Sequence, residues 1–327
     1  MNPLQRIQAS TGDFFPRFQS FFAQQFEQKD PVVDETLNHL RHANGKHIRP
    51  LIVALSSLLI ADRVTDEAVH LAVFMEMLHT SSLIHDDVID NSDTRRGHPT
   101  LNVIYNNHVA VLVGDYLLST AMLNGLRHAS KDTVLLLVEV AQKLALGELS
   151  QIKATHRDTI ISEEEYFDII DKKTASLFKV ATMIASSTAG ANAKQAKSLF
   201  VLGETIGMAF QVKDDIFDYF QDRETIGKPT GLDLQEGKVT LPLIYAYGKA
   251  SEQEKIQIEK WRKEIATDAH AGEALIAITK QLGGIEAACD KLAELLQKAR
   301  SELTAFEDSK AKQAFEDLLA YLEVREF

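Results

Sequence analysis

The sequence predicts an all-α protein, a single domain over residues 1–327 in which helices surround one central cavity. The first reason is proline placement: none of the seven prolines lies between Pro99 and Pro229 or after Pro242, and proline breaks the interior of a helix. The second is composition, because good helix formers such as Ala, Leu, Glu, Gln and Lys dominate those stretches. The third is that hairpin signals, alternating residues bounded by Asn-Gly or Asp-Gly, do not recur.

Apolar spacing places individual helices within this frame. Between Val134 and Leu149 the apolar residues follow the three-four rhythm of an amphipathic helix. Residues 68–82 are helical in pattern, and a further helix is expected after Asn44-Gly45. The length of the chain would allow about two domains, but no low-complexity tract or linker divides it. We therefore expect one helical domain.

Composition and charge exclude several classes of protein. The formal net charge of −12 argues against nucleic acid as a partner, because phosphate backbones bind basic surfaces. The single cysteine, Cys289, excludes an intrachain disulfide framework and is expected to be a small packed residue. Met1–Ser10 has no features of a secretory signal, and the longest apolar run, Leu51–Ala61, is too short to span a bilayer. A cytoplasmic location is expected, and contact with a membrane surface stays open.

Two aspartate clusters of identical spacing carry the strongest chemical signal. The first spans Asp86–Asp90 and the second spans Asp214–Asp218. Residues four apart share a helix face, so the first and last aspartates of each cluster project together, with Asp87 and Asp215 one step round. Each cluster alone would fit a solvated acidic face. Strongly apolar flanks predict buried helices instead, where ionised carboxylates are costly unless they are paired or bind metal.

Magnesium suits these clusters better than zinc does. Mg²⁺ is a hard cation that one or two carboxylates hold while substrate phosphates and water complete its shell. Zinc is disfavoured because no cluster of His and Cys at ligand spacing accompanies the aspartates. The aspartates therefore predict a magnesium site that binds phosphate groups.

Basic residues near both clusters identify phosphate as the partner. Lys46 and Arg49 precede an apolar helix, and Arg95 and Arg96 follow the first cluster. Further lysines are Lys172, Lys173, Lys228 and Lys238. Arginine presents a planar fork to phosphate oxygens, whereas lysine acts as a point charge. A nucleotide-binding P-loop is excluded, because Gly-x-x-x-x-Gly-Lys followed by Ser or Thr occurs nowhere. Two diphosphates fit these residues better than a nucleotide.

A set of motifs follows in a fixed order along almost the whole chain. They are Gly45-Lys46-x-x-Arg49-Pro50, His79-x-x-Ser82-Leu83-x-His85-Asp86-Asp87-x-x-Asp90, Arg95-Arg96-Gly97, Gly114-Asp115, Lys173-Thr174-Ala175, Gln211-x-x-Asp214-Asp215-x-x-Asp218, Gly227-Lys228 and Gly237-Lys238. On these motifs the chain resembles the trans-isoprenyl diphosphate synthase family, from about Leu37 to near Leu322. It departs at Asn44, where a second glycine is common, and at His47, where a basic residue is frequent.

The resemblance implies a fold, a partner and a role for each motif residue. The family fold is an all-helical bundle, usually a homodimer, with both aspartate motifs facing a central cavity. Asp86, Asp90 and Asp214 would ligate about two or three Mg²⁺ ions together with the substrate diphosphates, and Asp87, Asp215 and Asp218 would support them. Isopentenyl diphosphate would be held by Lys46, Arg49, His79 and Arg96. The allylic diphosphate would be held by Arg95, Lys173, Thr174, Gln211, Lys228 and Lys238.

The implied reaction is an ionisation, condensation and elimination that makes a linear polyprenyl diphosphate, for which a quinone side chain is one destination. In relatives that make short products, a bulky aromatic residue stands four or five positions before the first aspartate. Here those positions are Ser82 and Ser81. Met77, Leu78 and Phe74 lie one and two turns deeper, and Phe74 is expected to form the floor of the cavity. Met77 and Leu78 fit ordinary core residues at least as well. We expect a product beyond C20, the geranylgeranyl length.

Three alternatives stay open. A farnesyl or geranylgeranyl diphosphate synthase would share every motif and differ in product length. A class I terpene cyclase would share the fold and the first aspartate motif, but it would need no second diphosphate pocket. A regulatory subunit of a heteromeric synthase typically loses aspartates from one motif, whereas both motifs are intact here. Contact with a membrane for release of the product stays open as well.

Overall fold

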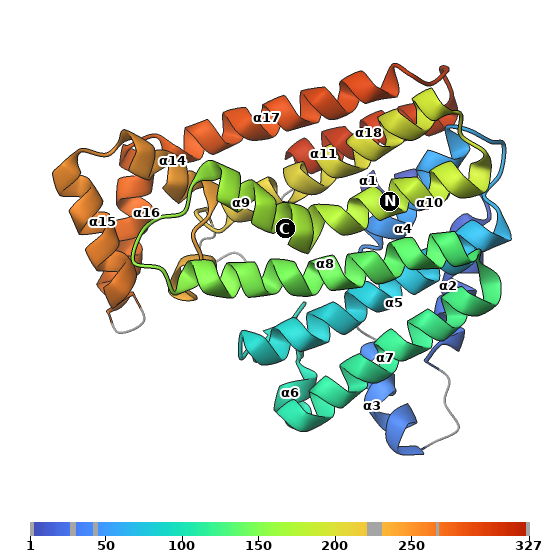
Figure 1. Ribbon diagram of the computed structural model, residues 1–327, viewed down its shortest axis with the longest axis horizontal. Helices are drawn as coiled ribbons and strands as arrows, with labels where there is room; N and C mark the ends of the chain where they lie inside the picture. The colour runs from blue at the N-terminus through green and yellow to red at the C-terminus, as the bar shows by residue number, and fades with distance from the viewer. Residues whose placement is uncertain (1–2, 27–30, 42–44, 221–230, 266–267, 325–327) are drawn as a thin grey trace. The chain divides into compact units, whose positions relative to one another are not determined.

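The computed structural model describes residues 3–26, 31–41, 45–220, 231–265 and 268–324, and most of them lie in helices (Figure 1). The prediction of an all-α fold is confirmed. Within the described residues the strands are two residues each, β1 (Thr94–Arg95) and β2 (His98–Pro99). The chain forms two compact units, which we call unit 1 and unit 2 and describe separately. That the whole chain forms a single domain stays a prediction.

Unit 1 comprises residues 1–141, 177–200 and 303–318. Its elements are α1 (Pro3–Ala9), α2 (Phe14–Gln24), α3 (Pro31–Arg41), α4 (Ile48–Leu58), α5 (Asp66–Ile89), β1, β2, α6 (Leu101–Ile104), α7 (Asn107–His128), the first part of α8 (Lys131–Thr155), α10 (Ser176–Ala189) from residue 177, the start of α11 (Ala193–Phe217) and most of α18 (Lys310–Val324). The helices predicted over residues 68–82 and after Asn44-Gly45 are confirmed as α5 and α4.

Helix α5 carries the first aspartate cluster and packs along α7 (Figure 1). It begins after Thr65, whose side chain accepts a hydrogen bond from the N–H of Ala68 at 3.2 Å and caps the helix. Two glycines of α7 permit the close approach. A Cβ atom at Gly114 would overlap the ring of His85, and one at Gly125 would overlap the ring of Phe74.

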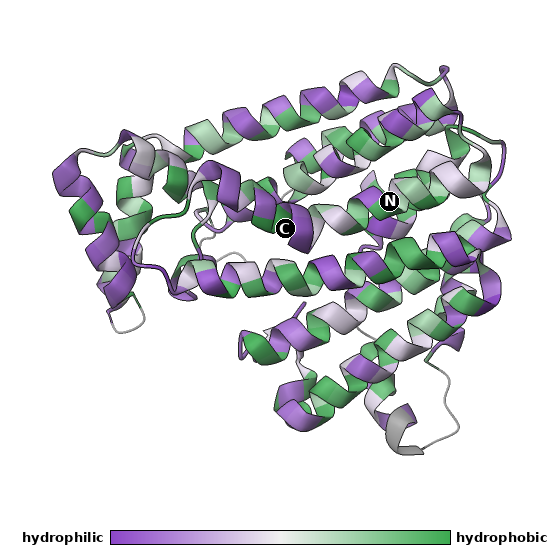
Figure 2. Cartoon of the chain, viewed as in Figure 1, coloured by the Kyte–Doolittle hydropathy of each residue, from purple (hydrophilic) through white to green (hydrophobic). Residues whose placement is uncertain are grey.

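Helix α7 is apolar on its outward side as well as on the side that faces α5. Hydrophobic residues recur along the visible side of α7 (Figure 2). On this helix Leu112 and Leu126 are 67% and 63% exposed. Among the described helices, α7 is long and apolar enough to cross a membrane, judged by length and composition only. In its most apolar window, 33% of the residues are buried inside the protein. A helix that is hydrophobic all round is normally covered on every side.

The structure contains a short β-hairpin that no convincing signal in the sequence predicted. Strand β1 pairs antiparallel with β2, and the two residues between them, Arg96 and Gly97, both have positive φ, 53° and 79°. Positive φ at both central residues defines the tight type I′ connection. The sequence signal was missed because arginine stands where asparagine or aspartate is usual. Two-residue strands also give no alternating pattern to detect.

Unit 2 comprises residues 142–176, 201–302 and 319–327. Its described elements are the second part of α8, α9 (Glu163–Ile170), the π-helix η1 (Asp171–Ala175), the second part of α11, α13 (Leu232–Gln235), α14 (Leu241–Lys249), α15 (Glu252–Glu264), α16 (Ala269–Gln281), α17 (Gly284–Leu303) and the end of α18. The amphipathic helix predicted over residues 134–149 is confirmed as α8.

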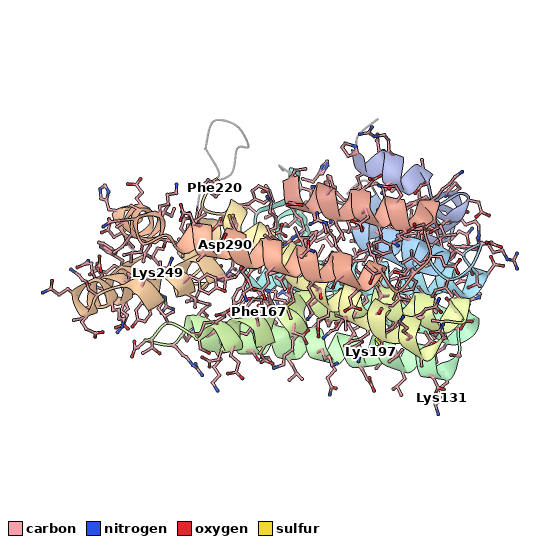
Figure 3. The ribbon with its side chains drawn as sticks, turned by 90° about the horizontal axis from the view of Figure 1, so that it is seen from above. Lys131, Phe167, Lys197, Phe220, Lys249 and Asp290 are labelled. Carbon is pink, nitrogen blue, oxygen red and sulfur yellow. The ribbon has the colours of Figure 1, made fainter. Side chains whose placement is uncertain are left out.

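Local contacts explain the ends of several unit 2 helices. A capping box starts α9, because the Ser162 side chain accepts from the N–H of Glu165 and the Glu165 carboxylate accepts from the N–H of Ser162. Lys249, which is labelled in Figure 3, lies at the end of α14. Its side chain donates to the carbonyl of Gly283 at 3.0 Å, which fixes the turn before α17. Cys289 on α17 is exposed, so its expected packing was wrong. Cys289 lies on the solvent-exposed side of the amphipathic helix α17.

Candidate active site

Both aspartate clusters lie at the C-terminal ends of long helices. In α5 the N–H of Asp90 donates to the carbonyl of Asp86 at 2.8 Å, and in α11 the N–H of Asp218 donates to the carbonyl of Asp214 at 3.3 Å. The last turn of neither helix contains a basic residue. The negative end of a helix dipole favours cations and disfavours carboxylates. Two helices that end in aspartates therefore suit a bound cation.

The middle aspartate of the first cluster has a different environment from its neighbours. Asp87 is 6% exposed and accepts a hydrogen bond from Nε of Arg95 at 2.6 Å. Burial raises the pKa of the Asp87 carboxyl, while the Arg95 ion pair acts in the opposite direction. Asp86 and Asp90 are partly exposed at the same helix end. The supporting role predicted for Asp87 thus fits an aspartate that orients Arg95.

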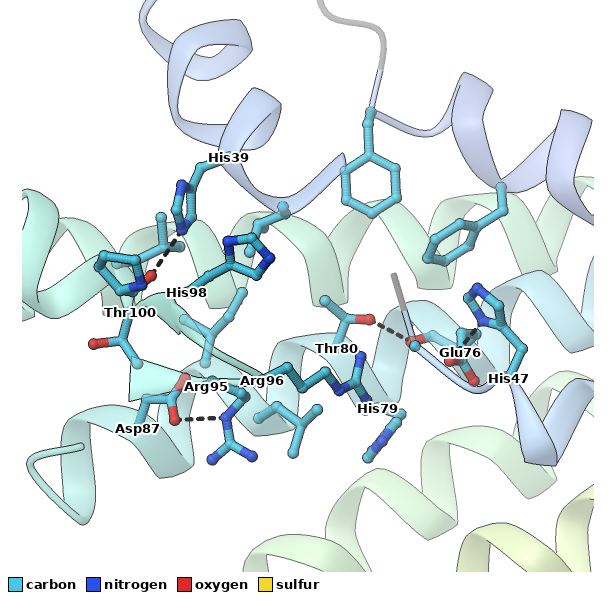
Figure 4. Close-up of a pocket in the computed structure, with 18 of the residues that line it drawn as sticks. His39, His47, Glu76, His79, Thr80, Asp87, Arg95, Arg96, His98 and Thr100 are labelled. Carbon is cyan, nitrogen blue, oxygen red and sulfur yellow. Dashed lines mark hydrogen bonds and ion pairs between the residues drawn. The ribbon is translucent and has the colours of Figure 1, made fainter. Parts of the chain in front are cut away.

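A cavity of about 460 Å³ lies in unit 1 beside the first cluster (Figure 4). The residues that line it come from α5, the β-hairpin, the segment before α4, and helices α2 and α3. Four predicted site residues line it: His79, Asp87, Arg95 and Arg96. Lys46 and Arg49 are not among its lining residues, although Gly45 and His47, on either side of Lys46, are.

Arg49, His79 and Arg96 come together as the sequence predicted. Nη1 of Arg49 donates to Nε2 of His79 at 2.9 Å. Burial, reinforced by the charge of Arg49, holds the pKa of His79 well below its usual range, so the ring is neutral and can accept this bond. The Arg96 guanidinium packs on Gly45, where a Cβ atom would lie 2.7 Å from Nη1. Glycine before Lys46 therefore makes room for Arg96.

Two residues predicted to set product length share the face of α5 that meets α7. The Ser81 hydroxyl donates to the carbonyl of Gly114 at 2.8 Å, and the fully buried Phe74 ring fills the notch at Gly125. Seven residues separate the two, which is about 10 Å along a helix. Met77 and Leu78 are buried core residues, and the Ser82 hydroxyl bonds to the carbonyl of His79 on its own helix.

Unit 2 contains a hydrogen-bonded network around the second cluster. The Tyr166 hydroxyl donates to Asp215 at 2.6 Å, Gln211 donates to the other oxygen of Asp215 at 2.7 Å, and Thr174 donates to Gln211 at 2.7 Å. Burial, followed by the charge of Asp233, raises the pKa of Asp215 well above its usual range. Asp215 thus orders the site through hydrogen bonds, which fits its supporting role.

The π-helix η1 presents Lys173 and Thr174 to a cavity of about 100 Å³ in unit 2. Lys173 forms an ion pair of 2.5 Å with Glu148 of α8. Gly147 makes this approach possible, because a Cβ atom there would lie 2.8 Å from the backbone nitrogen of Lys173. Single-turn π-helices often occur at functional sites, since they redirect side chains within a continuous helix.

Lys238 and two acidic residues complete the unit 2 site. Lys238 lies 2.5 Å from Glu236 and 3.7 Å from Asp233, and the N–H of Asp233 donates to Asp218 at 3.2 Å. Asp233 was missed in the sequence, although its position between two Gly-Lys pairs was a usable signal. Tyr166 and Glu148 were also missed, and their surroundings in the sequence gave no signal. The predicted Lys228 lies outside the described residues.

The residues fit magnesium bound together with a ligand. Within the described residues no three His, Cys, Asp or Glu side chains converge on a single point as a complete metal cage. Mg²⁺ is commonly held by one or two carboxylates while phosphate oxygens and water supply the other ligands. Carboxylates at the ends of α5 and α11 supply oxygen ligands of that kind.

Comparison with known proteins identifies the family. The sequence profile described as polyprenyl synthetase matches residues 30–279. The chain belongs to the polyprenyl synthetase family. It is therefore a prenyltransferase, as the motifs predicted.

Three relatives illustrate the range of this family. The all-trans-nonaprenyl-diphosphate synthase (geranyl-diphosphate specific) of Rhodobacter capsulatus is 36% identical over 96% of this chain and 95% of its own. The polyprenyl synthase of Caulobacter crescentus, solved in complex with calcium and isoprenyl diphosphate, has a TM-score of 0.88 and 29% identity over 99% and 97% of the two chains. The geranylgeranyl pyrophosphate synthase of Bacteroides thetaiotaomicron has a TM-score of 0.85 and 36% identity over 99% and 100%.

Proposed function

We propose that this polyprenyl synthetase condenses isopentenyl diphosphate with an allylic diphosphate to make a linear chain longer than C20. The observation that carries the proposal is that each aspartate cluster ends a helix in a unit that gathers its own set of basic side chains. Unit 1 offers Arg49, His79 and Arg96, and unit 2 offers Lys173 and Lys238. Two anionic substrates account for two such sets, whereas a terpene cyclase needs one.

Magnesium is the proposed metal, with Asp86, Asp90 and Asp214 as its ligands. The polyprenyl synthase of Caulobacter crescentus, which was solved with a divalent cation, calcium, together with isoprenyl diphosphate, supports this choice. When bound, Mg²⁺ supplies positive charge to the diphosphate as its bond to the allylic carbon breaks.

The protein's own side chains would bind, orient and neutralise. Arg95, Lys173 and Lys238 are proposed to hold the allylic diphosphate, so that charge is neutralised on the oxygen as the C–O bond breaks. Arg49, His79 and Arg96 would hold isopentenyl diphosphate with its double bond aimed at the allylic carbon. The new C–C bond forms from that double bond, and the adjacent carbon loses a proton to the released diphosphate. No side chain is needed as a nucleophile.

The test of this function is a requirement for both substrates and for the metal. Purified enzyme with Mg²⁺, isopentenyl diphosphate and farnesyl diphosphate should release diphosphate and form a longer prenyl chain. Adding EDTA in excess should reduce turnover by more than about 100-fold, and excess Mg²⁺ should restore it. Turnover that survives EDTA, or that proceeds without isopentenyl diphosphate, would count against the proposal.

The long-chain part of the proposal depends on the small side chain of Ser81. It lies on the α5 face that meets α7, about two turns above the Phe74 ring, and offers no bulk to stop a growing chain. The nonaprenyl synthase of Rhodobacter capsulatus supports a long product. The runner-up is a geranylgeranyl product, which the Bacteroides thetaiotaomicron relative favours.

Ser81→Phe is expected to shorten the product to C20 or less, because the aromatic ring would obstruct the path along α5 that we propose for the growing chain. Ser81→Ala is the matched control: it loses the hydrogen bond to Gly114 but keeps a small side chain, so the long product should persist. Overpacking is expected to cost about 1–3 kcal/mol of stability, so the unfolding temperature is recorded in parallel. Identical product lengths for a folded Ser81→Phe enzyme and the wild type would contradict this role.

A homodimer is the proposed assembly, with α7 at the interface. Leu112, Leu123 and Leu126 are 67%, 53% and 63% exposed, and their spacing places them on one face of the helix. The opposite face, which includes Val113 and Leu117, is buried against α5. An exposed helix face that carries several large apolar side chains marks an interaction site, and a second copy of α7 would cover it.

Leu112→Asp is expected to convert the dimer to a monomer, because it replaces the most exposed leucine of this face with a charge. Ile256→Asp on α15 is the matched control, since Ile256 has the same 67% exposure but lies alone on its helix surface. Light scattering after size-exclusion chromatography measures both masses. A dimeric Leu112→Asp protein would rule out this interface. The cytoplasmic location and contact with a membrane for product release stay predictions.

A further inference from the structure

A buried carboxylate lies among the cationic residues of the unit 1 site. Glu76 of α5 is 5% exposed and lines the same cavity as His79 and Arg96 (Figure 4). Negative charge at this position opposes the binding of an anionic ligand. None of the motif residues explains why it is there. Because the negative charge of Glu76 disfavours an anionic ligand, Glu76 needs a role other than contact with that ligand.

The Glu76 carboxylate has a specific partner in His47. Nδ1 of His47 lies 3.1 Å from Oε1 of Glu76, and both side chains are largely buried, with 15% and 7% exposed. The rings of Phe18 and Phe22 meet the His47 ring edge-on at 5.3 Å and 5.8 Å. Oε2 of Glu76 is buried and has no hydrogen-bond partner within the described residues. We call the pair His47–Glu76, with its two phenylalanines, the turn clamp.

The turn clamp holds backbone of unusual conformation. His47 caps the N-terminus of α4 with φ of 48°, in the left-handed region that residues other than glycine rarely adopt. Such conformations persist only where the surrounding structure fixes them. Lys46 precedes His47 directly, and Arg49 follows two residues later. The conformation of His47 therefore sets the direction of both cationic side chains.

The turn meets α5 at two points. Glu76 and His79 are three residues apart and so lie on one face of α5. Glu76 contacts His47, and His79 accepts from Arg49 at 2.9 Å. The contact with His79 holds the side chain of Arg49, which is assigned to isopentenyl diphosphate. The contact with Glu76 holds His47, whose backbone leads to Arg49.

The charge state of Glu76 is consistent with this arrangement. Burial opposes ionisation, but the His47 hydrogen bond and the nearby charges of the cluster lower the pKa of Glu76 to about 2. The carboxylate is thus ionised at neutral pH, with Arg49 and Arg96 near enough to be influenced by it.

We propose that Glu76 is a positioning residue for isopentenyl diphosphate, and that it acts through His47 on the turn that carries Lys46 and Arg49. The inference depends on the proposed function, because it assigns one substrate to that turn. It also makes a prediction of opposite sign to simple electrostatics. If Glu76 were only a nearby charge, neutralising it would strengthen the binding of a diphosphate; if it positions the turn, neutralising it weakens binding.

The experiment compares Glu76→Gln with the wild type for each substrate separately. The KM for isopentenyl diphosphate is expected to rise about tenfold, the effect of losing one hydrogen bond to a charged carboxylate. The kcat at saturation and the KM for the allylic primer should stay within about twofold, because none of the residues proposed to hold the primer lies on the turn that carries Lys46 and Arg49. Glu67→Gln removes a carboxylate from the first turn of the same helix and is the matched control.

A double-mutant cycle with His47→Asn tests whether the two residues act as one device. Asparagine tolerates the left-handed conformation of residue 47 but does not reach Glu76, so it tests the contact without forcing a change in the backbone. The double variant is expected to match the worse single variant rather than the product of the two effects. Unfolding temperatures identify any variant that fails to fold, in which case the other single variant supplies the test.

Three results would overturn the inference: an unchanged or lower KM for isopentenyl diphosphate in Glu76→Gln, equal rises for both substrates, or multiplicative effects in the cycle. Calorimetric titration with inorganic diphosphate adds a readout that needs no turnover, and Glu76→Gln should bind this probe about tenfold more weakly. A wild type that forms no prenyl product would instead refute the proposed function. The two failures are therefore distinguishable.

Discussion

Replacing Asp86 or Asp214 with alanine is expected to lower turnover by about 1,000-fold or more at saturating substrates and Mg²⁺, a barrier increase of about 4 kcal/mol. Each aspartate lies at the negative end of a helix dipole, in a last turn without basic residues. Removing one carboxylate there removes a proposed metal ligand and leaves the diphosphate charge less neutralised as the C–O bond breaks.

Matched aspartates separate this effect from a general loss of charge. Asp132 in the first turn of α8 and Asp290 on α17 are both exposed, one in each unit. Their alanine variants should keep turnover within about twofold, as is usual for surface substitutions. Turnover is followed by release of diphosphate, with the unfolding temperature as a check of folding. Near-normal turnover in both Asp86→Ala and Asp214→Ala would refute the assignment.

The second largest effect is expected at Lys173. Lys173→Gln should lower kcat/KM for the allylic diphosphate by about 100-fold, or about 3 kcal/mol, because its charge is proposed to stabilise the departing diphosphate. Glutamine keeps a donor for Glu148, which has a largely buried side chain and lies 2.5 Å from Lys173. The substitution therefore removes charge without leaving that carboxylate unpaired.

The neighbouring lysine is a stringent control. Lys172 pairs with Asp168 one turn back on the same helical segment, and Asp168 is more than half exposed. Lys172→Gln should change kcat/KM for either substrate by no more than about twofold. Steady-state kinetics with each substrate varied in turn measures both variants. Equal losses for Lys172→Gln and Lys173→Gln would mean that the π-helix, rather than the Lys173 charge, matters.

The fold was predictable because its signals are local and repeated. Proline-free stretches and three-four apolar spacing identified α5 and α8, since helices depend on residues close in the sequence. The β-hairpin was missed because two-residue strands have no period and because its turn uses arginine at positive φ. The division into two compact units depends on contacts between distant segments, which a single sequence does not display.

Site residues could be predicted where several charged residues stand close together in the sequence. They could not be predicted where a single residue stands outside any motif. Asp86, Arg96 and Lys173 stand in motifs, and the structure places them at helix ends, in turns and in a π-helix. Tyr166 and Glu76 each act through a single contact with a distant residue. His47 looked like a departure from the family, and the structure shows that its ring is held by Glu76 and two phenylalanines.

The length of the product made by the unmodified enzyme tests the central claim most directly. The enzyme is incubated with Mg²⁺, excess isopentenyl diphosphate and, in turn, geranyl, farnesyl and geranylgeranyl diphosphate. The products are dephosphorylated and sized by chromatography with mass spectrometry. We predict chains longer than C20 from every primer accepted, with the same final length. Products that stop at C20 or shorter, or no condensation with any primer, would contradict the claim.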